Sequence, residues 1–498
     1  MNQAFENMKP HLEKIMALNT AMTLFNWDSE TLAPKEAGAY TSKVIGILSN
    51  EYFKALVNDE VKDLIDQCKA AEDLTVEQKA IVRELGRELE ELQVIPQEEY
   101  REFSELQAEA TAVWARARKE NDYAYYAPTL KKLIEFQKKF AGYQAKEGQQ
   151  LYDVLLNQYE RGFDMESLDE FFRQVKEEIV PLLKQVVQKN DTIDTAFLTE
   201  YYDPKKQEEF GRFLAQYCGF DFEKGVLAES AHPFTTNLHN HDVRITTRYM
   251  ENKLDSSLFS VIHETGHALY ELGIADEITQ TPVGGGASMG MHESQSRFFE
   301  NMIGRNEAFW EPIYKKLTEL FPDQLKGVSL ERFIKAVNKA EPGLIRIDAD
   351  ELTYCLHIMV RYEIEKMIFA GQAEVDDLPK LWKEKYEEYL GVSPKTDAEG
   401  VMQDIHWAQG SFGYFPSYAL GSAFAAQFYH KMNEEMDVEA LLREGNLKPI
   451  REFLKNHIHR YGKVKETRDL IKEVTGEDFT PKYYIEYLKE KYQKLYQL

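Results

Sequence analysis

Helical periodicity runs through most of this sequence and constrains its fold more than any other feature. In residues 77–93, EQKAIVRELGRELEELQ, apolar side chains recur every three or four positions, with charged residues between them. This spacing places the apolar side chains on one stripe of a helix. Similar stretches begin at Pro96 and Pro128, where proline fits the first turn of a helix, and another ends the chain. We therefore expect a mostly helical fold.

One segment has the period of a β-strand instead. In residues 241–250, HDVRITTRYM, β-branched and aromatic side chains alternate with charged or polar ones. This alternation predicts one short, half-buried strand. No fixed-period repeat and no linker rich in Pro, Gly or Ser divides the sequence. Residues 1–498 are therefore expected to form a single domain.

The charge balance and the cysteines narrow the expected partners and location. The chain carries 85 Asp and Glu against 60 Lys and Arg, a formal charge of −25. That field repels phosphate backbones, so we expect no nucleic-acid partner. The three cysteines, Cys68, Cys218 and Cys355, are few and far apart, which fits a reducing compartment. No signal-peptide core and no apolar run of roughly 20 residues is present, so we expect a cytoplasmic protein without membrane association.

The stretch LFSVIHETGHALYELG, residues 258–273, carries the strongest chemical signal. His263 and His267 are four positions apart, so on a helix their imidazoles lie on one face and can converge on one ion. Glu264 follows the first histidine and lies beside that ion as a base, which is the H-E-x-x-H arrangement of zinc peptidases. Histidines also fall at this spacing by chance, so a third ligand is the test.

The third ligand is sought downstream, because a catalytic zinc normally takes three protein ligands and keeps one position open. The stretch MHESQSRFFENMIG, residues 291–304, supplies Glu293 at the start of an amphipathic segment. Asp276, Glu277 and His292 are weaker candidates, since a loop holds a ligand less firmly than a helix does. The donor types favour Zn²⁺, and Co²⁺ or Mn²⁺ fits the same donors.

These residues predict hydrolysis of a polarised carbonyl group. Zinc lowers the pKa of a bound water toward about 7. Glu264 takes a proton as the water attacks and delivers it to the leaving amine. The developing oxyanion needs a further hydrogen-bond donor. His406, Tyr414 and Tyr418 in DIHWAQGSFGYFPSY are candidates, and each is equally open to a role in aromatic packing.

Three glycine-bearing loops lie in the second half of the chain: residues 281–291 (TPVGGGASMGM), 395–404 (KTDAEGVMQD) and 408–418 (AQGSFGYFPSY). Glycine allows the backbone to approach a ligand closely, and it also serves ordinary turns. The GGG sequence is not a phosphate loop, because no Lys-Ser or Lys-Thr pair follows it. Both interpretations of these loops stay open at this point.

Six short motifs follow one another along the chain: HPF (His232–Phe234), DVRIT (Asp242–Thr246), HETGH (His263–His267), HESQ (His292–Gln295), IRIDAD (Ile345–Asp350) and GVMQDIHW (Gly400–Trp407). Together they resemble the carboxypeptidase Taq family of zinc metallocarboxypeptidases. The segments NWDSETLAP and AYYAPTL nearer the N-terminus are similar to that family as well. Six ordered motifs are far more specific than one H-E-x-x-H pattern, and the resemblance covers nearly the whole chain.

The resemblance implies an all-α fold related to neurolysin and angiotensin-converting enzyme. This is a mostly helical saddle in which two lobes flank a deep central groove, with a very small β-sheet beside the active site. It implies one catalytic domain over residues 1–498, with His263, His267 and Glu293 as zinc ligands and Glu264 as the base. The implied activity is release of single C-terminal residues from short peptides, with broad side-chain tolerance, by a homodimer.

A carboxypeptidase must also hold the free C-terminal carboxylate, and arginine offers it a planar bidentate partner. Arg244 in the predicted strand is favoured, because a strand edge near the metal also pairs with peptide backbone. Arg346 is the second candidate. Alternatively, it closes the groove or forms a structural ion pair with Asp348 or Asp350. His232 is a further substrate-binding candidate or a structural histidine.

Two other functions compete with this hypothesis. A zinc endo-oligopeptidase of the same helical type needs the same metal and base, and only its indifference to an amidated C-terminus would distinguish it. A non-catalytic peptide-binding relative has no need of a base beside the metal. The intact set of His263, Glu264, His267 and Glu293 therefore argues against a binding protein.

Overall fold

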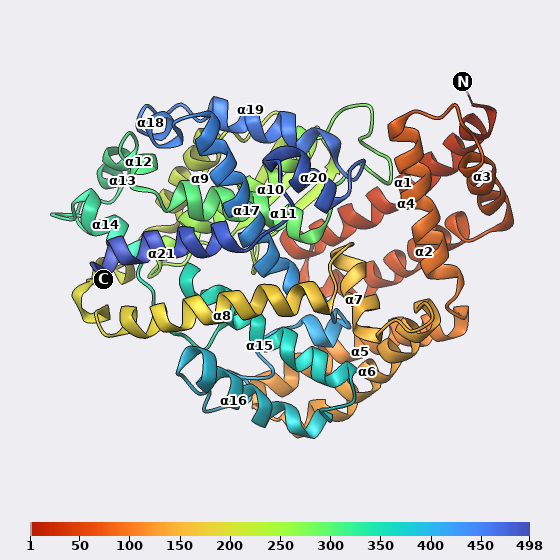
Figure 1. Ribbon diagram of the computed structural model, residues 1–498, viewed down its shortest axis with the longest axis horizontal. Helices are drawn as coiled ribbons and strands as arrows, with labels where there is room; N and C mark the ends of the chain where they lie inside the picture. Colours follow the sequence, from red (N-terminus) through yellow and green to blue (C-terminus); the bar gives the residue numbers. More distant parts are fainter. Residues whose placement is uncertain (1) are drawn as a thin grey trace. The chain divides into compact units, whose positions relative to one another are not determined.

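The computed structural model describes residues 2–498, apart from the side chains at positions 35, 39 and 191. The chain divides into two compact units, which are described separately. Unit 1 comprises Met1–Gln93, Asp194–Val337 and Phe428–Asp478. Unit 2 comprises Val94–Ile193, Asn338–Gln427 and Phe479–Leu498. The described residues are mostly helical and contain one three-stranded sheet, which confirms the expected fold class (Figure 1).

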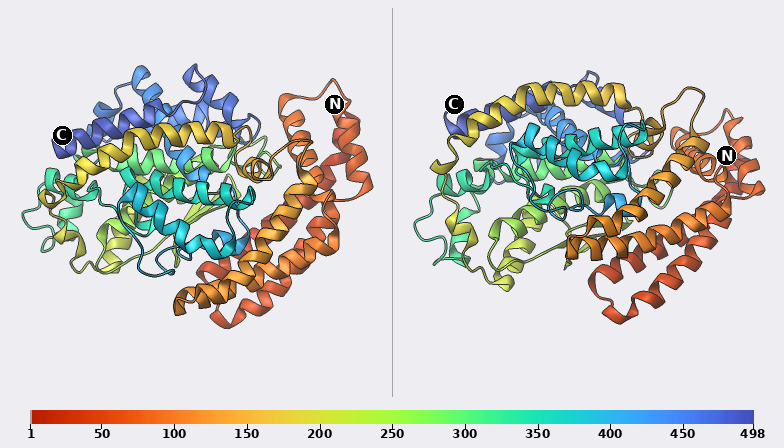
Figure 2. Two further views of the ribbon diagram at one scale, coloured as in Figure 1. Left: turned by 60° about the horizontal axis from the view of Figure 1, so that its bottom comes forward. Right: turned by 90° about the horizontal axis from the view of Figure 1, so that it is seen from below.

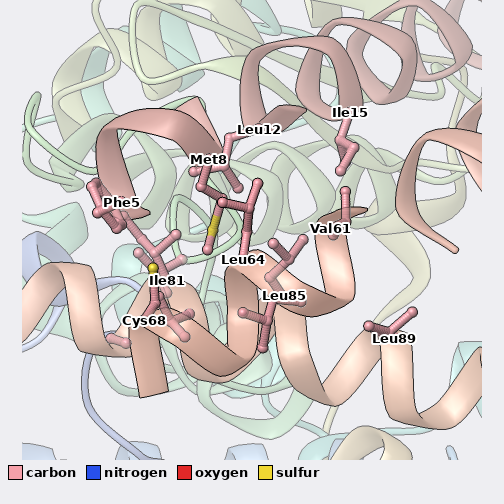
Figure 3. Packing of buried hydrophobic residues seen from close by; sticks show 14 of the residues in the cluster. Phe5, Met8, Leu12, Ile15, Val61, Leu64, Cys68, Ile81, Leu85 and Leu89 are labelled. Carbon is pink, nitrogen blue, oxygen red and sulfur yellow. The ribbon is translucent and has the colours of Figure 1, made fainter. Parts of the chain in front are cut away.

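The first segment of unit 1 is a group of four helices: α1 (Gln3–Thr31), α2 (Gly38–Leu56), α3 (Asp59–Lys69) and α4 (Val76–Gln93). Asparagine side chains cap α1 and α3, because Asn2 accepts from Phe5 N and Asn58 from Val61 N. The apolar stripe predicted in residues 77–93 is confirmed: Ile81, Leu85 and Leu89 are buried in one cluster with side chains of α1 and α3 (Figure 3).

The sheet of unit 1 consists of β1 (Gly225–Glu229), β2 (Thr235–His239) and β3 (Asp242–Thr247). The strand order is β1-β3-β2, with β1 parallel and β2 antiparallel to β3. The predicted strand is therefore β3, but it lies in the middle of the sheet. The proposal that Arg244 lies on a free strand edge is wrong, because both sides of β3 already pair with neighbouring strands. The edge strands are β1 and β2.

Helix α10 (Leu254–Gly273) packs against β3 and against α11 (Met289–Arg297), which continues as the π-helix η4 (Phe298–Gly304). Gly266 sits where α10 and α11 meet. A Cβ atom on Gly266 would lie 2.5 Å from the carbonyl oxygen of Gln295. Only glycine permits this approach, which brings the histidines of α10 close to Glu293 on α11.

The other α-helices that lie wholly within unit 1 come from segments far apart in the sequence. They are α9 (Pro204–Cys218), α12 (Glu307–Trp310), α13 (Tyr314–Leu320), α14 (Leu330–Val337), α18 (Val438–Arg443), α19 (Lys448–His457) and α20 (Thr467–Thr475). The last segment is tied to α11, where Gln295 Oε1 lies 2.8 Å from His459 Nε2. Trp310 of α12 and Phe333 of α14 pack against each other and are buried.

The regular elements among the described residues of unit 2 are all helices, joined by loops. Its long helices are α5 (Gln97–Glu120), α6 (Tyr123–Gln144), α7 (Leu151–Tyr159), α8 (Met165–Val187), α15 (Glu351–Phe369), α16 (Leu378–Leu390) and α21 (Lys482–Tyr496), with the first part of α17 (Pro416–Glu435). Figure 2 shows α21 lying beside α8, its neighbour in this unit. Between residues 2 and 498, none of the helices combines the length and the apolar character that crossing a bilayer requires.

One predicted helix start in unit 2 is wrong. Pro96 directly precedes α5, as expected, but α6 begins at Tyr123 and Pro128 lies inside it. Asp122 is the reason, because its side chain accepts a hydrogen bond from Tyr125 N and caps the helix. The helix therefore begins five residues before the start predicted at Pro128.

Candidate metal centre

Three side chains of unit 1 converge at the crossing of α10 and α11. His263 and His267 lie one turn apart on α10, and Glu293 faces them from α11. Glu293 Oε2 lies 3.4 Å from His267 Nε2 and 3.7 Å from His263 Nε2. One ligand atom from each residue falls within 4.8 Å of the other two. Asp276 and Glu277, the weaker candidates in the sequence, lie outside this group.

The donor set fits a divalent cation. Two ligand atoms held about 2 Å from one tetrahedral ion lie about 3.3 Å apart, close to the spacing observed here. Burial lowers the pKa of His267 to about 3, so its imidazole is neutral and free to bind a metal at pH 7. Burial acts to raise the pKa of Glu293, but Arg297 and His263 outweigh it and hold that carboxyl ionised. Two imidazoles and one carboxylate match the preferences of zinc.

Charged residues downstream on α11 and η4 contact the candidate ligands. Arg297 Nε donates to Glu293 Oε1 at 2.7 Å, which leaves Oε2 directed toward the histidines. Glu300 Oε2 lies 2.8 Å from His263 Nδ1, and Arg297 and Arg305 donate to its carboxylate. A carboxylate on the second nitrogen of a ligand histidine fixes the ring and its tautomer. The sequence analysis missed Arg297 and Glu300, whose spacing from Glu293 was the available signal.

Glu264 lies on α10, directly after His263, and its side chain is held by the edge strand β2. Its side chain is buried, and Thr235 Oγ1 donates to its Oε2 at 2.6 Å. Burial raises the pKa of Glu264 above the ordinary value of a carboxyl. A carboxylate in such an environment is a better proton acceptor than one in water.

The two other predicted residues of unit 1 lie on β3 and in the loop between β1 and β2. Arg244 on β3 donates to both carboxylate oxygens of Asp242 at 2.8 Å, and its guanidinium lies 4.8 Å from the centre of the Trp27 ring. This pairing leaves part of the guanidinium fork for another carboxylate. His232 is exposed in the loop before β2, where its carbonyl oxygen accepts from Ser230 Oγ at 2.6 Å.

The predicted residues of unit 2 form a second cluster. Arg346 is buried, and its Nε donates to Asp404 Oδ1 at 2.9 Å, while Arg361 binds the other oxygen. The suggested ion pair of Arg346 with Asp348 or Asp350 is wrong, because the carboxylate that faces its guanidinium comes from Asp404.

Aromatic residues complete the cluster of unit 2. His406 Nε2 lies 3.1 Å from the Tyr418 hydroxyl, and the Tyr414 and Tyr418 rings are 5.1 Å apart. The Arg346 guanidinium lies 4.9 Å from the centre of the Tyr418 ring. Burial and then Arg346 lower the pKa of His406 to about 3, so the imidazole stays neutral. The structure thus brings together His406, Tyr414, Tyr418 and Arg346.

The loop that carries these aromatic residues is fixed by one buried carboxyl group. Glu365 accepts hydrogen bonds from the Tyr152 hydroxyl, Trp407 Nε1 and Gly413 N at 2.7–2.8 Å. Burial raises the pKa of Glu365 to about 7, although all three donors act to lower it. Glu365 therefore titrates in the physiological range.

Replacing this group with Glu365→Gln should change how stability depends on pH. The pKa of Glu365 in the folded chain, about 7, lies above its ordinary value of 4.5. Its contribution to the free energy of unfolding is therefore fully present below pH about 4.5 and is lost as pH rises through about 7. The variant should lack this fall, which amounts to at most about 3 kcal/mol. Denaturant unfolding from pH 4.5 to 8 measures this fall, with Glu387→Gln, an exposed glutamate on α16, as the control. Equal slopes in the variant and the unsubstituted chain would contradict the assignment.

A mostly helical chain whose His-Glu-x-x-His helix meets a glutamate from a second helix has the architecture of a metallopeptidase. The chain belongs to the carboxypeptidase Taq (M32) metallopeptidase family, because the sequence model of that family matches residues 7–492. This match confirms the resemblance carried by the six ordered motifs.

Individual relatives cover the chain from end to end. Carboxypeptidase 1 of Bacillus subtilis (strain 168) is 45% identical over 489 residues, which are 98% of this chain and 97% of the relative. Thermostable carboxypeptidase 1 of Thermus thermophilus is 36% identical over 505 residues, 99% of each chain. The crystal structure of the M32 carboxypeptidase from Deinococcus radiodurans R1 has a TM-score of 0.97 at 33% identity, over 100% of both chains. The chain is therefore a metallocarboxypeptidase, a hydrolase of peptide bonds that uses a metal cofactor.

Proposed function

We propose that this metallocarboxypeptidase uses zinc and releases single C-terminal residues from short peptides with broad side-chain specificity. The observation that carries the proposal is the convergence of His263, His267 and Glu293, with Glu264 one residue from the first ligand. We also propose that residues 1–498 act as one catalytic domain.

The residues of the chain divide the chemistry among them. Zinc held by His263, His267 and Glu293 would polarise the substrate carbonyl and make a water molecule more acidic. Glu264 accepts the proton of the attacking water and transfers it to the leaving amine. Thr235 keeps the Glu264 carboxylate in one orientation by donating to its Oε2. We assign the donors that stabilise the developing oxyanion to His406, Tyr414 and Tyr418.

A small set of peptides tests the proposal directly. Each peptide is incubated with the zinc-loaded chain, and mass spectrometry follows the products over time. The expected result is stepwise loss of one residue from a free C-terminus, no reaction with the C-terminal amide, and no reaction after chelation. Internal cleavage of the amidated peptides would instead identify an endo-oligopeptidase. A zinc-loaded chain that hydrolyses none of the peptides would overturn the proposal.

Arg244 is the proposed partner of the substrate carboxylate, with Arg346 and His232 as further substrate-binding residues. Arg244→Ala should lower kcat/KM for peptides with a free C-terminus by about 10–100-fold, since a hydrogen bond to a charged group contributes about 1.5–3 kcal/mol. Binding of the amidated analogues, measured as their competitive inhibition of this hydrolysis, should be weakened less. Arg248→Ala, an exposed arginine just after β3, is the matched control. Equal losses on both kinds of peptide would remove Arg244 from this role.

Two features of the cellular protein are proposed on more general grounds. The three cysteines of the chain are all unpaired and buried, which fits a reducing compartment such as the cytoplasm. A homodimer is proposed from the family resemblance.

A further inference from the structure

A chain of hydrogen bonds runs from the second ligand histidine into the interior of unit 1. His267 Nδ1 lies 2.6 Å from His292 Nδ1, and His292 Nε2 lies 2.6 Å from Glu271 Oε1. Glu271 is buried at 4% exposure, and Gly286 N and Asn237 Nδ2 donate to its carboxylate as well. Among the residues that the structure describes, no carboxylate therefore contacts the second nitrogen of His267 directly, whereas Glu300 contacts that of His263.

The positions of the protons in this series of hydrogen bonds follow from its first and last members, His267 and Glu271. His267 Nε2 must be unprotonated to bind a metal, so the proton of its ring is on Nδ1 and is donated to His292 Nδ1. The proton of the His292 ring is then on Nε2 and is donated to Glu271. Glu271 faces three donors and is an acceptor only. Each hydrogen bond of the series is therefore donated in the direction from His267 toward Glu271.

The GGG loop is built around the ring of His292. A Cβ atom on Gly286 would lie 2.7 Å from His292 Cδ2 and 3.0 Å from Tyr270 Cε1. The neighbouring Gly285 faces open space, because the nearest atom to its Cβ would be Lys463 Cε at 4.0 Å. The loop is also anchored, since Ala287 N donates to the Tyr270 hydroxyl at 3.0 Å. The close backbone approach that the glycines permit is thus an approach to His292.

We propose that His292 and Glu271 are positioning residues for the metal site: together they hold His267 in the tautomer and orientation that present Nε2 to the ion, and Gly286 shapes the space for the His292 ring. The inference rests on the proposed metal-binding role of His267. It assigns the histidine of the HESQ motif to the support of a ligand, a different role from the weak ligand candidate expected from the sequence.

Paired substitutions of His292 separate support from mere packing. In His292→Asn the side-chain oxygen takes the place of Nδ1 and can still accept from His267, whereas in His292→Gln the amide takes the place of Nε2 and cannot. Zinc affinity is measured by competition with a chromophoric chelator, and the visible spectrum of the Co²⁺-loaded chain reports ligand geometry. We expect His292→Gln to weaken zinc binding by about 10–100-fold and to alter the cobalt spectrum. His292→Asn should lose clearly less affinity. Thermal unfolding of the metal-free variants shows whether both are folded.

Glycine substitutions test the same inference without removing a polar group. Gly286→Ala should weaken zinc binding because the new methyl group displaces the His292 ring, and Gly285→Ala should bind zinc as the unsubstituted chain does. Unchanged zinc affinity in His292→Gln, or equal losses in His292→Asn and His292→Gln, would overturn the proposed positioning role of His292. If the unsubstituted chain bound no zinc, the proposed function would fail and this inference with it. If the unsubstituted chain and Gly285→Ala both bind zinc normally, a contrary result with the His292 variants overturns only the positioning role and leaves the proposed function in place.

Discussion

Replacing Glu264 with glutamine should leave the metal in place and lower kcat by about 10²–10⁴-fold, the usual contribution of a positioned general base. Glutamine keeps the shape of the side chain and can still accept from Thr235, but it cannot take a proton from water. Because Glu264 is no part of the ligand set, zinc affinity should stay close to that of the unsubstituted chain. The measurement combines steady-state hydrolysis of a short peptide with metal analysis of the same preparation.

The matched control for this variant is Glu251→Gln, an exposed glutamate just before α10. It should show full turnover and full zinc content. A Glu264→Gln chain that keeps its turnover would assign proton transfer to another group. Loss of zinc together with turnover would mean that Glu264 supports the ligands, and the base role would then lack support.

Replacing Glu293 with glutamine should have the second large effect, this time on the metal itself. The substitution removes the only anionic donor of the predicted set and replaces the carboxylate that Arg297 contacts at 2.7 Å with a neutral amide. Supporting residues around a metal change affinity by about 10–100-fold, so loss of a direct ligand should weaken zinc binding by more than about 100-fold. Chelator competition measures the affinity, and turnover should recover in part when zinc is added in excess.

The control for the ligand variant is Glu307→Gln, an exposed glutamate at the start of α12. It carries the same chemical change in the same unit and should bind zinc normally. Normal zinc affinity in Glu293→Gln would remove Glu293 from the ligand set. The group formed by His263, His267 and Glu293 would then no longer explain the metal dependence of the family.

The helices and the α10 pattern were predictable because they depend on local spacing. A helix repeats every 3.6 residues, so the stripe of α4 and the shared face of His263 and His267 follow from sequence alone. Glu293 was also placed in a helix by the apolar period of its own segment. These predictions needed no knowledge of which elements touch.

The errors arose where the answer depends on contacts distant in sequence. The position of β3 inside its sheet depends on β1 and β2, which a single alternating segment does not reveal. The partner of Arg346 is Asp404, 58 residues away. The start of α6 was missed for a local reason, because a proline was preferred over the cap that Asp122 supplies.

His292 shows the same limit within the candidate site. Its place next to Glu293 in the sequence suggested a ligand, yet the two side chains contact different atoms of α10. Glu293 faces the Nε2 atoms of both histidines, whereas His292 lies against Nδ1 of His267. The ring of His292 meets Glu271 of α10 and the backbone of Gly286. Sequence spacing could not indicate this, because the loop of residues 281–291 has no period and its glycines fit an ordinary turn equally well.

Unit 1 is assembled from three separated segments, and this has a consequence for biosynthesis. The residues expected to bind the metal are translated by position 293, but His459, which contacts Gln295 of α11, emerges from the ribosome more than 160 residues later. Contacts between such distant residues form only once both have been made. While residues 338–427 are being synthesised, unit 1 of the nascent chain therefore still lacks its last segment, Phe428–Asp478. His263, His267 and Glu293 would already be present in this incomplete unit. Firm loading of the cation is accordingly expected to be a late, largely post-translational event.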